Sequence, residues 1–265
     1  MPGPKTFNVL DLKGAVKGSV QKPEAFEESV RPEIIRRAAI AEQTHEFQPQ
    51  GHFILAGMQT SAKYYGAMGS YRSGRHMGIA IRPRQKLGGG RQGDVRRIPS
   101  AVKGKRAHPH MVEKTIVERI NKKEYQKAVA SAVAATAMKD YVQSSKELPV
   151  ILSDELQAIK KTKDIVKLIE TLGFGSYLEN GKVHIKKGLR RTAHQKHYKK
   201  SVLFVVKADN GVLKAAGNIP GVDACKTDSL VVNLLAPGGK PGRLAIWSES
   251  AVKSLDDDIG KLNVE

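Results

Sequence analysis

The chain has 265 residues, of which 40% are hydrophobic, so it is long enough to bury one sizeable core or two small ones. It has no hydrophobic run long enough to span a bilayer and no apolar stretch of a signal peptide at its start, so we expect a cytosolic protein without membrane contact. A single cysteine, Cys225, excludes internal disulfides and zinc sites built on paired cysteines, and we expect a small packed side chain.

The formal net charge of +19 is concentrated in two segments. Residues 61–106 hold twelve Lys and Arg against one acid, Asp94, and residues 182–200 hold eight Lys and Arg and no acid. The remaining chain is neutral. Two runs this unbalanced would repel themselves without a counter-charge, and they indicate a protein that binds a polyanion.

The N-terminal residues predict a hairpin and a helix, after which the regular pattern ends. Residues 7–12 and 15–20 flank Lys13-Gly14 and predict a small hairpin. Ser29 is a candidate cap for a helix over residues 30–45, with Pro32 in its first turn. From 48 to 110 glycine and proline recur every few residues and no helical or strand period persists. An insert of this length is either functional or disordered.

Regular patterning resumes at residues 111–120. Asn121 and Glu124 have a spacing like that of a capping box, and the small residues of 128–137 favour a closely packed helix. Residues 148–152 predict a buried strand followed by caps at Ser153 and Asp154.

The last third predicts further strands and helices in alternation. A helix is expected over 162–172, ended by Gly173. Residues 202–206 form a continuous apolar run of the kind buried on both faces of a parallel sheet, and 244–247 form another. Ser248 is expected to cap a short final helix. The predicted fold is therefore a layered α/β domain with a mainly parallel central sheet flanked by helices.

The predicted organisation has two parts. Residues 1–47 and 111–265 are expected to form a single globular domain, and residues 48–110 an extended loop that is rich in Gly and Arg and carries positive charge.

Gly88-x-Gly90-x-x-Gly93 has the spelling of a dinucleotide-binding turn and leaves an alternative open, an α/β nucleotide-binding or RNA-modifying enzyme. That turn requires a strand before it, a helix after it and an acidic residue about 20 positions on. Pro83 lies among arginines before the motif, and Pro99 interrupts the residues after it. The context therefore speaks against this alternative.

Catalytic and metal-binding patterns are weak. His108-Pro109-His110 and His194-x-x-His197 lie beside basic runs, which favours contact with phosphate or bases over metal. The run Asp256–Asp258 is expected to be a solvated terminus. We expect no enzyme activity and no cofactor, with Mg²⁺ present only as part of an RNA environment.

Residue chemistry favours RNA as the partner. Glycine lets the backbone approach phosphates, arginine bridges phosphates or stacks on bases, and Tyr64, Tyr65 and Tyr71 offer stacking surfaces. The loop has little apolar material of its own, so it is expected to order on its partner. Because no recognition helix or ribbon is evident, RNA is preferred to DNA. A free-standing RNA regulator is a further alternative that differs only in where the protein resides.

Four strings resemble one family over most of the chain: AGMQTSAKYYG (56–66), RIPSAVKGKRAHPH (97–110), LPVILSDELQAIKKTKDIVKLIE (148–170) and the segment 209–255. In this order they are similar to the large-subunit ribosomal protein L four family in its archaeal and eukaryotic branch. The absence of a long basic tail after Leu255 resembles the archaeal members.

The resemblance implies a structural constituent of the large ribosomal subunit in the cytoplasm. It implies binding to large-subunit, 23S-type rRNA, an early role in subunit assembly, and a loop that helps to form the polypeptide exit tunnel, where nascent polypeptide passes. It also implies proximity to the ribosomal protein L twenty-two family. Residues 86–95 depart from the usual family sequence.

The candidate RNA-contact residues fall in the two basic segments. Those of the loop are Lys63, Tyr64, Tyr65, Tyr71, Arg72, Arg75, Arg82, Arg84, Lys86, Gly88, Gly89, Gly90, Arg91, Arg96, Arg97, Lys103, Lys105, Arg106 and His108. Those of the second segment are Lys182, Lys186, Lys187, Arg190, Arg191, His194, Lys196, His197, Lys199 and Lys200.

Overall fold

The computed structural model describes residues 6–69, 71, 73–142, 144, 146–181, 184–185 and 197–262. The chain forms two compact units, one of residues 1–46 and 117–265 and the other of residues 47–116. In the part of the chain that the structure describes, no helix is both long and apolar enough to cross a membrane.

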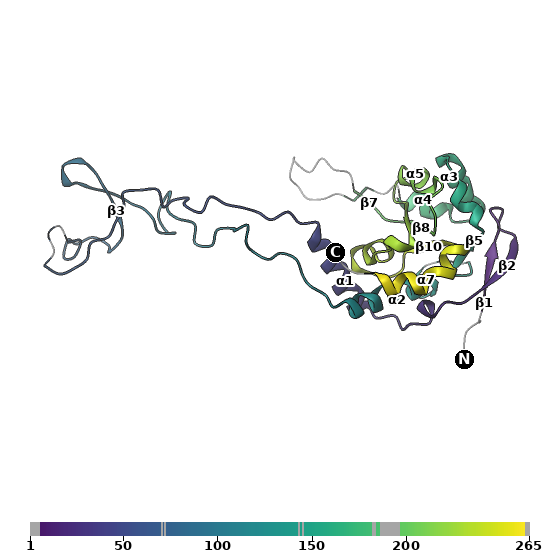
Figure 1. Ribbon diagram of the computed structural model, residues 1–265. Coiled ribbons are helices and arrows are strands. Elements are labelled where there is room, and N and C mark those ends of the chain that lie inside the picture. Colours follow the sequence, from purple (N-terminus) through teal and green to yellow (C-terminus); the bar gives the residue numbers. More distant parts are fainter. Residues whose placement is uncertain are drawn as a thin grey trace. The chain divides into compact units, whose positions relative to one another are not determined.

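A six-stranded sheet organises the first unit (Figure 1). Its strand order is β2-β1-β5-β10-β8-β9, and only the β1–β2 pair is antiparallel. The strands are β1 (Thr6–Leu10), β2 (Val16–Gln21), β5 (Val150–Leu152), β8 (Val202–Val206), β9 (Asp223–Lys226) and β10 (Leu244–Ser248). The predicted hairpin is confirmed as β1 and β2, with Gly14 at a positive φ of 84° in its turn.

Helices cover both faces of the sheet, as Figure 1 shows. The helices against one face are α1 (Pro32–His45), α2 (Lys122–Ala137), α6 (Val232–Leu235) and α7 (Glu249–Lys261). Those against the other face are α3 (Thr162–Thr171), α4 (Gly175–Gly181) and α5 (Val212–Gly217). The predicted α/β class with a mainly parallel sheet is therefore confirmed.

The alternation of side chains along β8 and β10 divides the core into two clusters. Leu203 and Val205 pack with Trp247 on the face of α1, α2 and α7. Phe204 and Ile246 pack on the opposite face, against α3, α4 and α5. All these side chains are fully buried, because a strand covered on both faces has no solvent-facing side. This explains why residues 202–206 read as a continuous apolar run.

Cys225 lies in β9 and is buried, as predicted for a small packed side chain. Burial raises the pKa of its thiol to about 12. The thiol is therefore protonated and unreactive at neutral pH.

The start of α1 differs from the prediction. The helix begins at Pro32, and its N-cap is Arg31, which offers no side-chain cap. The backbone N–H of Arg31 instead donates to Ser131 Oγ (2.7 Å), and that hydroxyl donates to the carbonyl of Ser29 (3.0 Å). Ser29 is thus joined to α2, by a contact between residues about a hundred positions apart that no local pattern reveals.

The predicted regular structure at residues 111–120 is wrong. These residues form turns and extended chain, and α2 begins only at Lys122. Asn121 precedes the helix without a side-chain cap, and the Glu124 carboxylate pairs with Arg37 at 2.8 Å instead of closing a capping box.

Side chains from distant positions in the sequence also accept hydrogen bonds from backbone N–H groups in the first turn of a helix. The Ser153 side chain makes no cap bond to the short 3₁₀ helix η3 (Asp154–Ala158). Asp154 Oδ1 instead accepts from the N–H of Ser250 (3.0 Å) in the first turn of α7. The Ser248 hydroxyl accepts from the N–H of Ala251 (3.3 Å), as predicted for the cap of this helix.

The acidic run in α7 is not a solvated terminus, because α7 continues to Lys261. Asp258 is buried and pairs with Lys207 at 2.8 Å. Asp256 accepts from the backbone N–H groups of Glu24 (2.9 Å) and Ala25 (3.0 Å) in the short helix η1 (Glu24–Phe26). Both carboxylates therefore fix α7 to neighbouring elements.

Deleting residues 71–98 should leave the first unit folded. Both hydrophobic clusters draw their residues from the first unit alone. Among the described residues of 47–116, only Ala62 is buried. We expect the melting temperature by calorimetry to change by less than about 3 °C. As a control, Trp247→Ala should lower it by more than about 6 °C, because it opens a cavity in the core. A comparable fall for the deletion would contradict this account.

Candidate nucleic-acid interface

The second unit contains one short hairpin, in a segment for which the sequence predicts no regular structure. Strand β3 (Arg84–Lys86) pairs antiparallel with β4 (Gln92–Val95) around the turn Gly88–Gly90. The N–H of Leu87 donates to the carbonyl of Arg91 (3.0 Å) and closes the turn. Gly89 and Gly90 have positive φ values of 68° and 80°, which glycine adopts without strain.

The hairpin rules out the dinucleotide-turn reading of the glycine motif. A dinucleotide site requires that the third glycine opens a helix whose N-terminus faces the pyrophosphate. Here Gly93 lies inside strand β4. The glycines serve a hairpin turn, and the expectation that no strand forms in this region is corrected.

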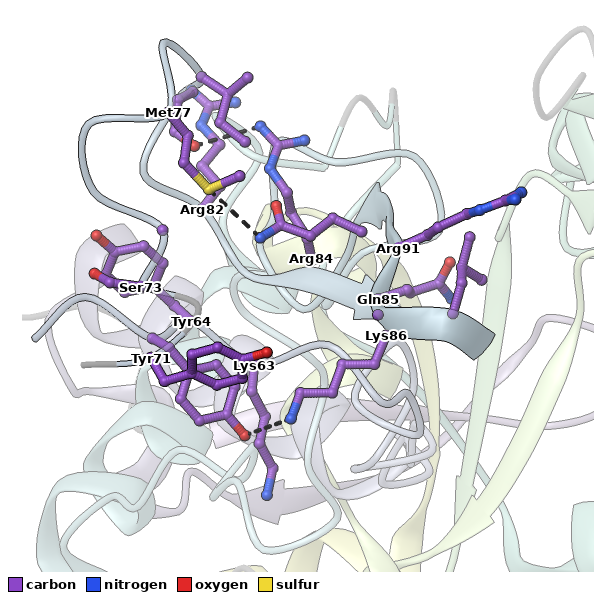
Figure 2. Close-up of a pocket in the computed structure, with 17 residues that line it drawn as sticks. Lys63, Tyr64, Tyr71, Ser73, Met77, Arg82, Arg84, Gln85, Lys86 and Arg91 are labelled. Carbon is purple, nitrogen blue, oxygen red and sulfur yellow. Dashed lines mark hydrogen bonds between the residues drawn. The ribbon is translucent and has the colours of Figure 1, made fainter.

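The hairpin forms one wall of a pocket of about 1010 Å³ within the second unit, shown in Figure 2. Among the described residues, its lining includes cationic and tyrosine side chains and no carboxylate. We call it the tyrosine pocket, and define it by Lys63, Tyr64, Tyr65, Tyr71, Arg82, Arg84, Lys86 and Arg91. Together with Gly90, which also lines the pocket, nine of the predicted contact residues are thus brought together in one place, although they are spread over 29 positions of sequence.

Pairing across the second unit shapes this pocket. Lys63 forms an antiparallel bridge with Arg84, which places residues 61–63 alongside β3. The N–H of Lys86 donates to Ser61 Oγ at 3.2 Å. Sequence reasoning did not single out Ser61, since its role depends on a contact across 25 residues that the sequence does not signal.

Tyr65 and Lys86 form the closest polar contact of the pocket. Lys86 Nζ donates to the Tyr65 hydroxyl at 2.8 Å and lies 4.3 Å from the centre of its ring (Figure 2). This hydrogen bond lowers the pKa of the Tyr65 phenol, and the charge of Lys63 adds to the effect. The lysine therefore holds the ring in one position.

Tyr64 is held by glycines. A Cβ on Gly66 would collide with the Tyr64 ring, and one on Gly74 would lie 3.2 Å from Tyr64 Cε2. The N–H of Gly74 donates to the carbonyl of Tyr65 at 2.6 Å and fixes this close approach. The glycines at 66 and 74 therefore allow the backbone to pack against an aromatic ring.

Arg96 and Arg97, two further predicted contact residues, bind the protein itself. Arg96 donates to the carbonyl of Val102 (2.5 Å) and pairs with Asp94 at 3.1 Å. Arg97 donates to the carbonyl of Ala62 at 3.4 Å. Both side chains are partly buried, so they help to shape the unit as well as adding to its charge.

The remaining predicted residues of the loop lie outside the pocket lining. These exposed side chains are Arg75, Lys103, Lys105, Arg106 and His108, and Arg72 lies outside the described residues.

Most of the second basic segment lies outside the described residues, namely Lys182, Lys186, Lys187, Arg190, Arg191, His194 and Lys196. His197 belongs to β7 (His197–Tyr198), which pairs with β6 (His184–Ile185). Lys199 is exposed, whereas Lys200 pairs with Asp223 at 2.8 Å. Within the described residues, no group of three His, Cys, Asp or Glu side chains could hold a metal ion.

Comparison with known proteins assigns the chain to a family. A family model described as Ribosomal protein L4/L1 family matches residues 20–258. The chain belongs to the ribosomal protein L4/L1 family.

Curated relatives with the name "Large ribosomal subunit protein uL4" agree with this assignment. The protein of Archaeoglobus fulgidus is 42% identical, and the match covers 94% of this chain and 97% of the relative. That of Methanococcoides burtonii is 39% identical, over 95% and 98%. That of Methanocaldococcus jannaschii is 37% identical, over 94% and 97%. These relatives are archaeal, which confirms the branch indicated by the sequence.

Members of the ribosomal protein L4/L1 family are structural constituents of the ribosome and not enzymes, and its curated relatives are named for the large subunit. Membership confirms the predicted class of protein and its location in the cytoplasmic ribosome. The enzyme alternative is therefore rejected on two grounds, the family and the strand that contains the third glycine of the motif.

Proposed function

We propose that this ribosomal protein binds large-subunit rRNA and acts early in subunit assembly, with residues 47–116 as its main RNA-contact segment. The observation that carries the proposal is the tyrosine pocket, in which five cations and three tyrosines meet without a carboxylate. Charges arranged in this way attract phosphates, and tyrosine rings stack on bases.

The distribution of charge supports the same proposal. Residues 47–116 hold thirteen Lys and Arg against two acids, and many of these basic residues are exposed. Exposed tyrosine and methionine side chains accompany them, including Tyr71 at 85% and Met68 at 74% exposure. A surface that is both cationic and rich in exposed apolar side chains suits a partner that offers phosphates and base faces together.

The proposal extends to the place of the segment in the subunit. Residues 61–106 would pass through large-subunit rRNA and help to form the polypeptide exit tunnel, near the ribosomal protein L twenty-two family and within reach of nascent polypeptide. No cofactor is needed for this role apart from the Mg²⁺ of the rRNA environment. The second basic segment, residues 182–200, would add further rRNA contacts.

Binding of the full chain to a large-subunit rRNA transcript tests the proposal. We expect tight binding, and the logarithm of the association constant should fall linearly with the logarithm of the salt concentration. The slope should correspond to several phosphate contacts, because each contributes about 0.7 to 0.9. A filter-binding titration over a range of salt concentrations measures it. Equal affinity for the transcript and for double-stranded DNA of the same length would contradict the proposal.

A further inference from the structure

Three cationic side chains of the tyrosine pocket have no partner among the residues that the structure describes. In the part of the chain that the structure describes, the side chains of Lys63, Arg82 and Arg91 make no hydrogen bond or ion pair. Figure 2 shows Arg91 extending from the hairpin away from the tyrosines, with Arg82 at another edge of the pocket. Because no carboxylate lines the pocket, these charges are available to an anionic ligand at several points of its rim.

Two tyrosine side chains of the pocket are positioned by contacts within the second unit. Tyr64 packs against Gly66 and Gly74, and Tyr65 is fixed by Lys86. The two rings nevertheless remain 39% and 43% exposed. When a ligand stacks on these rings, the tyrosine side chains therefore lose little conformational entropy. The ligand group that such a surface favours is a flat aromatic one.

The size of the pocket sets the scale of the ligand. Its volume of about 1010 Å³ is at the upper end of the range of roughly 300–1,000 Å³ that is typical of sites for small ligands. This is room for one nucleotide with its flanking phosphates. A base that is stacked in a duplex cannot offer its face to a tyrosine, so the nucleotide has to be unstacked.

We propose that the tyrosine pocket binds one unstacked nucleotide of RNA, whose base stacks on Tyr64 or Tyr65 while its flanking phosphates pair with Lys63, Arg82 and Arg91. This inference rests on the proposed function and makes it more specific, since it assigns base recognition to the pocket and phosphate contact to its rim. Phosphate contacts elsewhere in the second unit are independent of it.

An acidic peptide is the competing ligand for the same cations. Carboxylates would satisfy Lys63, Arg82 and Arg91 but would leave the exposed tyrosine faces without a flat partner. The combination of fixed rings and unpaired cations therefore favours the nucleotide.

Two oligonucleotides separate base stacking from phosphate contact. Fluorescence anisotropy of the full chain would compare a short oligouridylate with an oligonucleotide of the same length that has abasic positions at its centre. We expect the oligouridylate to bind about tenfold more tightly, as loss of stacking on a tyrosine would produce. Replacing Tyr64 and Tyr65 together with leucine should abolish the preference, whereas replacing both with phenylalanine should keep it because the rings remain.

Matched variants and a competitor complete the test. Phe53→Leu removes an exposed aromatic ring outside the pocket, and it should leave the preference unchanged. A 4-thiouridine in the oligonucleotide should crosslink to the peptide that contains Tyr64 and Tyr65. Equal affinity of the wild-type chain for both oligonucleotides would overturn the inference. So would stronger competition by oligoglutamate than by unlabelled oligouridylate.

The outcomes for the pocket and for the proposed function are separable. Salt-dependent binding of the rRNA transcript together with equal affinity for the two oligonucleotides would overturn the pocket inference alone. Failure to bind the transcript would overturn the proposed function as well.

Discussion

Replacing the five cations of the tyrosine pocket together with glutamine should weaken binding to a large-subunit rRNA transcript by roughly 10²- to 10³-fold near 0.15 M salt. Three of these side chains, Lys63, Arg82 and Arg91, have no partner in the described part of the chain, so their charges are not already neutralised. Each phosphate contact that is lost should reduce the salt slope by about 0.7 to 0.9, and five should reduce it by about 4. Filter binding at several salt concentrations measures both quantities.

A control with the same change in charge shows whether position matters. Five exposed lysines of the first unit are suitable for replacement with glutamine, namely Lys13, Lys139, Lys163, Lys167 and Lys214. This control should reduce affinity much less, because these residues belong to the part of the chain that is neutral overall. Equal losses for the two variants would show that net charge alone drives binding and that the pocket has no special role.

Arg243→Ala should destabilise the first unit by about 3 to 5 kcal/mol, which is the largest effect on stability that we expect from a single charged residue. The Arg243 side chain is 1% exposed. It donates to the carbonyls of Leu234 (2.8 Å) and Val202 (2.9 Å) and pairs with Asp223 at 2.6 Å. Truncation would leave these acceptors unsatisfied inside the domain and would open a cavity.

The carboxylate partner of Arg243 is adapted to this pairing. Burial raises the pKa of Asp223. The charge of Arg243 and the hydrogen bonds from Lys200 and Arg243 lower this pKa by more than burial raises it, so it lies below its usual value. Asp223 is therefore ionised at neutral pH, and the alanine variant would leave it beside Lys200 alone.

Thermal unfolding checks this prediction, with a fall of about 6 to 20 °C for Arg243→Ala. Arg37→Ala is the matched control, because Arg37 forms an exposed ion pair with Glu124 and should contribute about 1 kcal/mol or less. Similar melting temperatures for the two variants would contradict the role assigned to Arg243.

The strands and the fold class could be predicted because buried strands have a recognisable apolar sequence pattern. Residues 202–206 are apolar at every position since both faces of β8 are covered. Ser248 was found as a helix cap because its partner, Ala251, lies only three residues away. Local chemistry with local partners is readable in a single sequence.

The features that escaped prediction depend on distant partners. Ser131 satisfies the start of α1, and Asp154 satisfies the start of α7, across about a hundred residues in each case. The acidic run in α7 was misread for the same reason, since Lys207 and the η1 backbone N–H groups are the partners of its carboxylates. Polar residues at these places resemble solvated ones until the fold is known.

The candidate site was predictable as a segment and not as a pocket. Charge alone located residues 61–106. It did not show that Lys63 and Lys86 would line one pocket, or that Arg96 and Arg97 would bind backbone carbonyls, because these contacts depend on how the hairpin pairs with residues 61–63. The sequence likewise gave no sign that the glycine motif would form a hairpin turn.

Sedimentation of a tagged form of the chain in extract from cells that express it tests the central claim most directly. On a sucrose gradient at low salt, the account predicts that the chain sediments with large ribosomal subunits and with their rRNA. A chain with residues 71–98 deleted should be folded but less firmly associated, and it should shift toward the top of the gradient as salt rises. Recovery of the full chain only among free proteins at the top would contradict the account.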